Sequence, residues 1–104
     1  MGVVAIVPLK ALSDAKRRLA PELDARHRRK LVATLFETVV RACLASAAVD
    51  RVLVVAGDTA AVALARPLGV EVVLERRRGL PAAMAAAEAA TRDAAATVVV
   101  MADL

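Results

Sequence analysis

Short apolar runs alternate with longer amphipathic segments along the whole chain. The runs occupy residues 3–7, 51–55, 70–74 and 97–101, and valine is the commonest residue in each. Short β-branched runs are typical of strands that are buried on both faces of a sheet. We expect the first strand to end at Pro8, because proline has no N–H to donate to a sheet ladder. The pattern therefore predicts four strands.

The segments between these strands have the spacing of helices. Asp24 is a candidate N-cap for a helix at residues 25–47, where apolar residues recur at i and i+4. A second helix is expected at residues 59–67, and Asp58 is better explained as its N-cap than as a ligand. The alanine-rich segment from Pro81 predicts a third helix, because proline is favoured at a first helical position.

Strands that alternate with helices predict parallel pairing with right-handed crossovers. We therefore expect one α/β domain over residues 1–104, a Rossmann-like parallel sheet in a three-layer α/β/α sandwich. A strand order of 3-2-1-4 would expose residues 97–101 as an apolar edge, where self-association is expected. Ligands of such folds bind outside the carboxyl ends of the strands, so the candidate functional residues are those that directly follow each strand.

Composition narrows the class of protein. The chain is 60% hydrophobic, but 26 of its residues are alanine, which contribute little to a core. No apolar run approaches 18 residues without a charge, so we expect no membrane span. Pro8 and Lys10 interrupt the apolar start before a signal peptide could form. The lone Cys43 cannot form an internal disulfide, and a reducing, cytoplasmic location is expected.

The chain is basic, with a net charge of +4 and a pI near 10.2. This balance indicates anionic partners, but it does not distinguish nucleic acid from a nucleoside triphosphate or a phosphorylated metabolite. Phe36 is the one aromatic residue, so the chain lacks the stacking surfaces of single-strand binders. The basic clusters at residues 26–30 and 76–78 fit solvated surface better than a binding stripe. We expect no nucleic-acid partner.

The loop after the first strand, residues 8–20, is a candidate binding segment, and one helical turn is expected in it near residues 15–19. Its cations are Lys10, Lys16, Arg17 and Arg18. Such a loop can surround a triphosphate and neutralise the charge that grows on leaving pyrophosphate. It contains neither GxxxxGK[ST] nor GxGxxG. From the residues alone, an ordinary solvated loop is an equally good explanation.

Two further positions could take part in binding. Asp103 directly follows the fourth strand, where a carboxylate can ligate Mg²⁺ together with phosphate oxygens and waters. A turn or cap residue is the alternative. Gly79 and Leu80 open the last helix, and the backbone N–H groups at this helix start could bind a phosphate. The alternative is that these residues form a plain turn before the helix. His27 has no second His or metal-binding Cys partner, and no Ser-His-Asp or Cys-His arrangement can be built.

Together these segments resemble the guanylyltransferases that activate 2-phospho-L-lactate or phosphoenolpyruvate in biosynthesis of the deazaflavin coenzyme F-420. The opening VVAIVPLKALSDAKRRLAPEL is similar to that family's strand, P-x-K, short gap and A-K-S-R-L. The matching residues are Pro8, Lys10, Ala15, Lys16, Arg18 and Leu19. VDRVLVVAGD, LGVEVV, a start similar to G-L-N-A-A, and a strand ending in A-D-L follow in the family's order.

The resemblance implies a nucleotidyltransferase of the glycosyltransferase-A-like type. It also implies Mg²⁺-dependent transfer of GMP from GTP to the phosphate of a small acid, with release of pyrophosphate. The implied site residues are Lys10, Lys16 and Arg18 at the triphosphate, Pro8, Leu9, Gly79 and Leu80 at the nucleotide, and Asp103 at Mg²⁺. The alanine-, arginine- and valine-rich composition suits a high-GC bacterium, and for such a source the resemblance implies phosphoenolpyruvate as the acceptor. 2-Phospho-L-lactate is the alternative acceptor.

The chain departs from the family pattern at two residues and in length. Arg17 replaces a serine, and Pro81 replaces an asparagine, which puts base recognition there in doubt. The family continues well beyond A-D-L. We therefore expect residues 1–104 to form the N-terminal part of a single nucleotidyltransferase domain, truncated after the fourth strand. The alternative functions are a catalytically inactive remnant with at most weak nucleotide binding, or a basic nucleic-acid-binding module.

Overall fold

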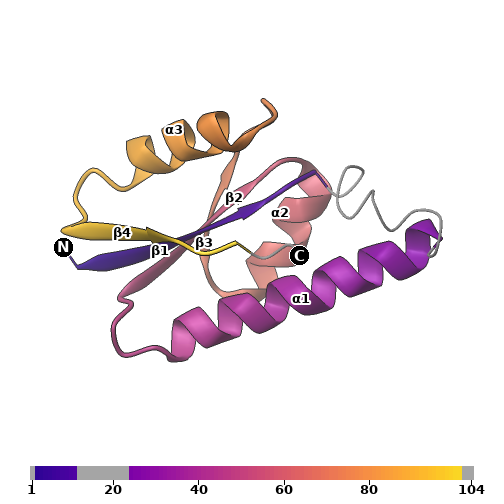
Figure 1. Ribbon diagram of the computed structural model, residues 1–104, viewed down its shortest axis with the longest axis horizontal. Coiled ribbons are helices and arrows are strands. Elements are labelled where there is room, and N and C mark those ends of the chain that lie inside the picture. Colours follow the sequence, from indigo (N-terminus) through magenta and orange to yellow (C-terminus); the bar gives the residue numbers. More distant parts are fainter. Residues whose placement is uncertain (1, 12–23, 102–104) are drawn as a thin grey trace.

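A computed structural model describes residues 2–11 and 24–101 as a four-stranded parallel sheet with helices on both faces (Figure 1). The elements are β1 (Val3–Leu9), α1 (Ala25–Ala45), β2 (Arg51–Ala56), α2 (Thr59–Ala65), the 3₁₀ helix η2 (Arg66–Leu68), β3 (Glu71–Leu74), α3 (Leu80–Ala90) and β4 (Ala96–Val99). The strand order is β3-β2-β1-β4, as predicted. The Rossmann-like α/β architecture is therefore confirmed.

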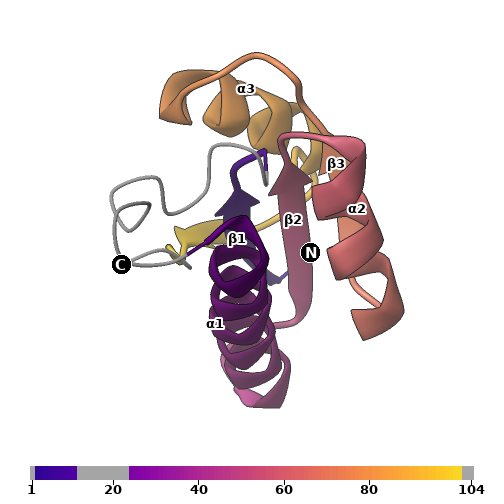
Figure 2. The same ribbon diagram turned by 90° about the vertical axis from the view of Figure 1, so that its right-hand side faces the viewer.

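Two apolar clusters, one on each face of the sheet, hold the layers together. Successive residues of a strand direct their side chains to opposite faces. Val7 and Val54 therefore pack with Phe36 of α1 in one cluster, whereas Ile6 lies with Ala87 of α3 in the other. Figure 2 shows α1 and α3 on opposite sides of the sheet. Because α3 contacts the sheet largely through alanine, its side of the core is the thinner one.

β1 continues through Pro8 to Leu9, so the expectation that Pro8 ends this strand is wrong. In a parallel sheet, successive residues bond to opposite neighbouring strands. On the β2 side the Leu9 carbonyl accepts from the Gly57 N–H at 2.9 Å, and on the β4 side the Ile6 carbonyl accepts from the Val100 N–H at 2.9 Å. The nitrogen of Pro8 therefore lies on the β4 side, past the end of that strand. There its missing N–H interrupts no ladder bond to the described residues.

The two helix starts that were predicted from aspartates are confirmed. The Asp24 carboxylate accepts from the His27 N–H at 2.8 Å, and the Asp58 carboxylate accepts from the Ala61 N–H at 2.8 Å. The His27 backbone N–H, followed by its ring, lowers the pKa of Asp24. α1 ends at Ala45, slightly earlier than expected. Among the described residues, no helix combines the length and apolar character needed to cross a membrane.

Arg51 joins three segments at the amino end of the sheet. Its Nε and Nη2 donate to the two carboxylate oxygens of Glu71, each at 2.8 Å, and its Nη1 donates to Asp93 at 3.1 Å. Arg51 begins β2, Glu71 begins β3, and Asp93 lies between α3 and β4. The guanidinium lowers the pKa of both carboxyl groups, and they raise the pKa of Arg51. Arg51 therefore links the start of β2 to the start of β3 and to the segment between α3 and β4.

We predict that Arg51→Gln lowers the melting temperature at pH 7 by several degrees. The pKa values of Glu71 and Asp93 lie below their ordinary 4.5 and 3.8 in the folded chain, so their stabilisation is present above those values. It is lost as the pH falls through the lowered pKa values. Melting curves from pH 7 to pH 2 should therefore show the gap between variant and unmodified chain closing in acid.

Arg41→Gln is the matched control for this prediction. Arg41 pairs with Glu37 one helical turn away, and both side chains are largely exposed. Exposed pairs of this type contribute little to stability. A loss of stability as large in Arg41→Gln as in Arg51→Gln would contradict the role given to the Arg51 cluster.

Candidate functional site

The carboxyl ends of the strands form one edge of the sheet, and the strand order reverses there between β1 and β4. The register places Leu9 opposite Ala56, and Ala56 opposite Leu74. β4 ends earlier, with Val99 opposite Ile6. In parallel α/β sheets, ligands bind outside such an edge at the point of reversal. The chain leaves β1 at this point, so the segment that begins with Lys10 starts at the position expected for a ligand.

The end of β1 combines one buried and one exposed side chain. Leu9 is only 5% exposed and packs in the cluster beneath α1. Its carbonyl is used by the Gly57 N–H. Pro8 is half-buried, whereas Lys10 is exposed. A ligand at this edge would therefore meet the Lys10 ammonium, while Leu9 anchors the end of the strand from below.

Gly57 lies against the backbone that follows β1. A Cβ atom on Gly57 would lie 3.0 Å from the carbonyl carbon of Lys10 and 3.1 Å from the Cα of Ala11, and still closer to the Ala11 nitrogen. Any side chain would therefore displace the start of the basic loop. The sequence identifies Gly57 as a turn residue, but its contact with Ala11 depends on the fold. Gly57 is thus a positioning residue that motif matching alone does not find.

The described carboxylates at this edge already have partners. Asp58 caps α2 through the Ala61 N–H, which confirms the cap assigned to it. Glu75 accepts from the guanidinium of Arg77 at 2.6 Å and from its backbone N–H at 3.0 Å, and these bonds lower the pKa of Glu75. Within residues 2–11 and 24–101, no three His, Cys, Asp or Glu side chains gather closely enough to hold a metal ion.

Gly79 and Leu80 start α3 at the same edge, on the face of the sheet opposite α1. Gly79 has φ 98° and ψ 155°, a backbone region that is essentially restricted to glycine. The Leu80 side chain is 49% exposed. Pro81 lies in the first turn, as expected, and contributes no N–H there. The start of α3 therefore offers one donor fewer than an ordinary helix start.

The structure brings together the predicted site residues that it describes, although it does not describe all of them. Pro8, Leu9, Lys10, Gly79 and Leu80 all lie at the carboxyl edge. The remaining predicted residues, Lys16, Arg18 and Asp103, lie outside the described residues, as do Arg17 and the helical turn expected near residues 15–19.

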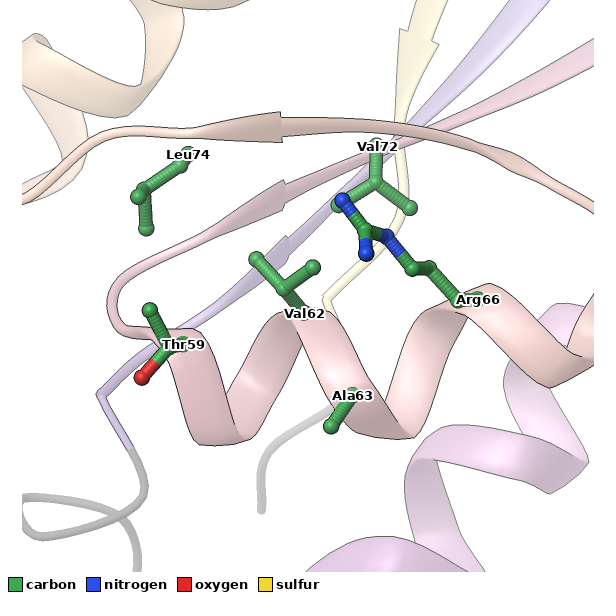
Figure 3. Close-up of a pocket in the computed structure, with 6 residues that line it drawn as sticks. All are labelled: Thr59, Val62, Ala63, Arg66, Val72 and Leu74. Carbon is green, nitrogen blue, oxygen red and sulfur yellow. The ribbon is translucent and has the colours of Figure 1, made fainter.

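A hollow of about 270 Å³ opens between α2 and β3 (Figure 3). Its lining residues are Thr59, Val62, Ala63, Arg66, Val72 and Leu74. None of them is a predicted site residue, and the lining is aliphatic apart from Thr59 and Arg66. It offers few polar groups to a triphosphate, so the edge at Lys10 remains the better candidate for an anionic ligand.

We predict that Gly57→Ala costs about 1–3 kcal/mol of stability, because the new methyl group overlaps the backbone after β1. Gly69→Ala is the comparison. Gly69 has φ 74° and nothing within 4 Å of an added Cβ, so only backbone strain of about 1–2 kcal/mol is expected there. Both changes should lower the melting temperature, but only Gly57→Ala should shift the amide NMR signals of Lys10 and Ala11. Unmoved Lys10 and Ala11 signals would disprove the contact.

Comparison with known proteins shows the family of the chain. The sequence matches the family described as "Guanylyl transferase CofC like" over residues 3–104. It is 38% identical to a phosphoenolpyruvate guanylyltransferase of Roseiflexus castenholzii, over all of this chain and 49% of the relative. It is 44% identical to one of Streptomyces avermitilis, over 84% of this chain and 41% of the relative. The chain spans about half the length of these curated relatives, and it belongs to the CofC-like guanylyltransferase family.

Proposed function

We propose that this chain binds GTP at the carboxyl edge of its sheet and supplies the nucleotide-binding part of a guanylyltransferase. The enzyme would transfer GMP from GTP to phosphoenolpyruvate and release pyrophosphate, in biosynthesis of coenzyme F-420. The single observation that carries this proposal is the match to the guanylyltransferase family over residues 3–104. Curated relatives of the chain are named phosphoenolpyruvate guanylyltransferase. 2-Phospho-L-lactate is the alternative acceptor.

The chemistry requires positioning and neutralisation of charge rather than a nucleophilic side chain. A phosphate oxygen of the acid attacks the α-phosphorus of GTP, the bond from that phosphorus to the bridging oxygen breaks, and pyrophosphate leaves with the bonding electrons. Cations that contact the β- and γ-phosphates stabilise the charge that develops on the leaving group. We assign this role to Lys10, Lys16 and Arg18. The exposure of Lys10 at the point of strand reversal supports its part in this assignment.

The nucleotide would lie between the start of the basic loop and the start of α3. Gly79, in a conformation that favours glycine, lets the chain turn into α3 close to this edge. Backbone groups near Gly79 and Leu80 would contact the base or ribose, and Pro8 and Leu9 would form the floor beside Lys10. Because Pro81 provides neither an amide side chain nor an N–H, guanine recognition must depend on other groups than the asparagine of the family pattern.

A Mg²⁺ ion fits the donor set at this edge in kind. Mg²⁺ accepts one or two protein carboxylates and completes its shell with phosphate oxygens and water. Asp58 and Glu75 already have partners in the α2 cap and in Arg77. We assign the ion to Asp103, the aspartate of the A-D-L motif of the family pattern. A bound Mg²⁺ would supply positive charge that offsets the negative charge of the phosphates.

The other two functions that the sequence leaves open are less well supported. A catalytically inactive remnant gains no support from the comparisons, whose named relatives are enzymes. A module that binds single-stranded nucleic acid would use stacking surfaces, and Phe36, the one aromatic residue, is 1% exposed in the core. We place the reaction in the cytoplasm, because the buried, unpaired Cys43 thiol suits a reducing compartment.

We predict that GTP with Mg²⁺ raises the melting temperature of the chain by several degrees. At a free ligand concentration of 100 times Kd, binding to the folded state adds about 2.7 kcal/mol to the free energy of unfolding. Lys10→Ala should abolish most of this shift, because it removes the described cation at the strand end. Differential scanning fluorimetry across a GTP titration measures both effects.

Arg92→Ala is the matched control for Lys10→Ala. It also removes one exposed positive charge, but from the far end of α3. The GTP-dependent shift should survive in this variant. A melting temperature of the unmodified chain that does not respond to GTP and Mg²⁺ would contradict the proposed site.

We also propose that two copies of the chain associate through β4. All four residues of β4 are exposed, and its apolar side chains Val98 and Val99 are 49% and 42% exposed, with Met101 just beyond at 48%. An exposed apolar edge strand is a template for pairing with another chain. The partner proposed here is a second copy, because each copy presents the same open edge.

For the exposed strand β4 we predict that Val98→Lys shifts the chain toward monomer in sedimentation velocity experiments. A lysine on an edge strand opposes pairing through charge and hydration. Leu44→Lys is the control, since Leu44 is 50% exposed but lies on α1. A chain that is monomeric before any substitution would refute this assembly.

A further inference from the structure

Among the described residues, the cations away from the carboxyl edge have carboxylates or helix carboxyl ends beside them. Arg51 pairs with Glu71 and Asp93, and Arg41 pairs with Glu37. The two others, Arg66 and Arg92, lie at or directly after the last turns of η2 and α3, next to the negative ends of helix dipoles. These positive charges therefore have a structural explanation.

Three of the cations in the first turns of α1 lack such compensation among the described residues. Arg26, Arg29 and Lys30 are exposed, and no ion pair joins any of them to another described residue. The first turn of α1 contains no acidic residue. The N-cap carboxylate of Asp24 is engaged by the N–H and the ring nitrogen Nδ1 of His27, each at 2.8 Å. We call Arg26, Arg29 and Lys30 the α1 patch.

Folding alone does not favour the α1 patch. Residues at i, i+3 and i+4 are neighbours on a helix surface, so Arg26 repels both Arg29 and Lys30. Arg26, in the first turn, also lies at the positive end of the helix dipole. Local rules that are broken without a structural gain mark functional positions in many proteins. A bound anion would relieve both repulsions at once.

We propose that the α1 patch, Arg26, Arg29 and Lys30, captures the polyphosphate of the incoming nucleotide and delivers it to the carboxyl edge. This inference rests on the proposed GTP-binding function and adds a kinetic role for residues outside the site. α1 begins on the side of the sheet where the strands end, as Figures 1 and 2 both show. The patch therefore lies on the same side of the molecule as Lys10.

The proposed ligand is a free polyphosphate rather than a nucleic acid. A triphosphate presents several negative charges on a short span, which matches three cations within two helical turns. Exposed cations in water act over a distance set by salt, about 30 Å at 0.01 M and about 8 Å at 0.15 M. The patch should therefore raise the association rate strongly at low salt and contribute little to the dissociation rate.

The test compares two triple variants that lose the same charge. Arg26→Gln, Arg29→Gln and Lys30→Gln remove the patch, whereas Arg41→Gln, Arg66→Gln and Arg92→Gln remove compensated cations. Stopped-flow mixing of the chain with N-methylanthraniloyl-GTP and Mg²⁺ gives association and dissociation rates at several salt concentrations. The patch variant should associate about tenfold more slowly at low salt, with an unchanged dissociation rate. The control variant should associate much faster than the patch variant.

Titration of the isotope-labelled chain with inorganic tripolyphosphate tests the patch independently of GTP. The amide signals of residues 26–31 should shift at low salt, and the patch variant should lose these shifts. The patch variant should also melt no lower than the unmodified chain, because its own repulsion is gone. Arg26→Lys with Arg29→Lys should keep the rate, since steering depends on charge and not on guanidinium geometry.

The possible results separate the two proposals. Failure of the unmodified chain to bind the fluorescent nucleotide, with shifts at residues 26–31 on adding tripolyphosphate, would refute the GTP site and support the patch. Equal slowing by both triple variants, or no shift with tripolyphosphate, would refute the patch. Tighter binding of a DNA duplex than of tripolyphosphate to these residues would overturn it in favour of a nucleic-acid surface.

Discussion

The pairing of β1 on both of its sides is the constraint on which the rest of the structure depends. β1 pairs with β2 through Leu9, but among the described residues its pairing with β4 stops at Ile6. The last residues of β1 therefore extend past the end of β4 while they are still paired with β2. That unequal ending leaves room for Pro8 within the strand and brings Lys10 out at the point of strand reversal. Burial of β1 between two helical layers fixes this geometry in place.

The fold was largely predictable, because local pattern and topology rules agree. Valine-rich runs separated by amphipathic segments predict parallel strands, and the right-handed crossover rule restricts their order. The misassigned end of β1 shows the limit of this reasoning. Whether proline ends a strand depends on which neighbour its nitrogen faces and how far that neighbour extends. Helix and strand ends elsewhere differ by one or two residues, because terminal hydrogen bonds depend on packing rather than on propensity.

The candidate site was predictable in position but not in its supporting contacts. The rule that ligands bind at carboxyl strand ends directs attention to Lys10 and Gly79 from sequence alone. The close approach of Gly57 to Ala11 and the joining of Arg51 to Asp93 could not be foreseen. Each links residues that are far apart in the chain, and Gly and Arg are common in turns and on surfaces for other reasons.

The two ends of the sheet use arginine in opposite ways, and this contrast follows from their different tasks. At the amino end, Arg51 is saturated by two carboxylates, so its charge contributes to holding β2, β3 and the α3 crossover together. At the start of α1, Arg26, Arg29 and Lys30 form no ion pair with another described residue, and their mutual repulsion opposes helix stability. An end that stabilises the fold needs its charges paired. Under the proposed function, the other end receives an anionic ligand and would need its charges available for it.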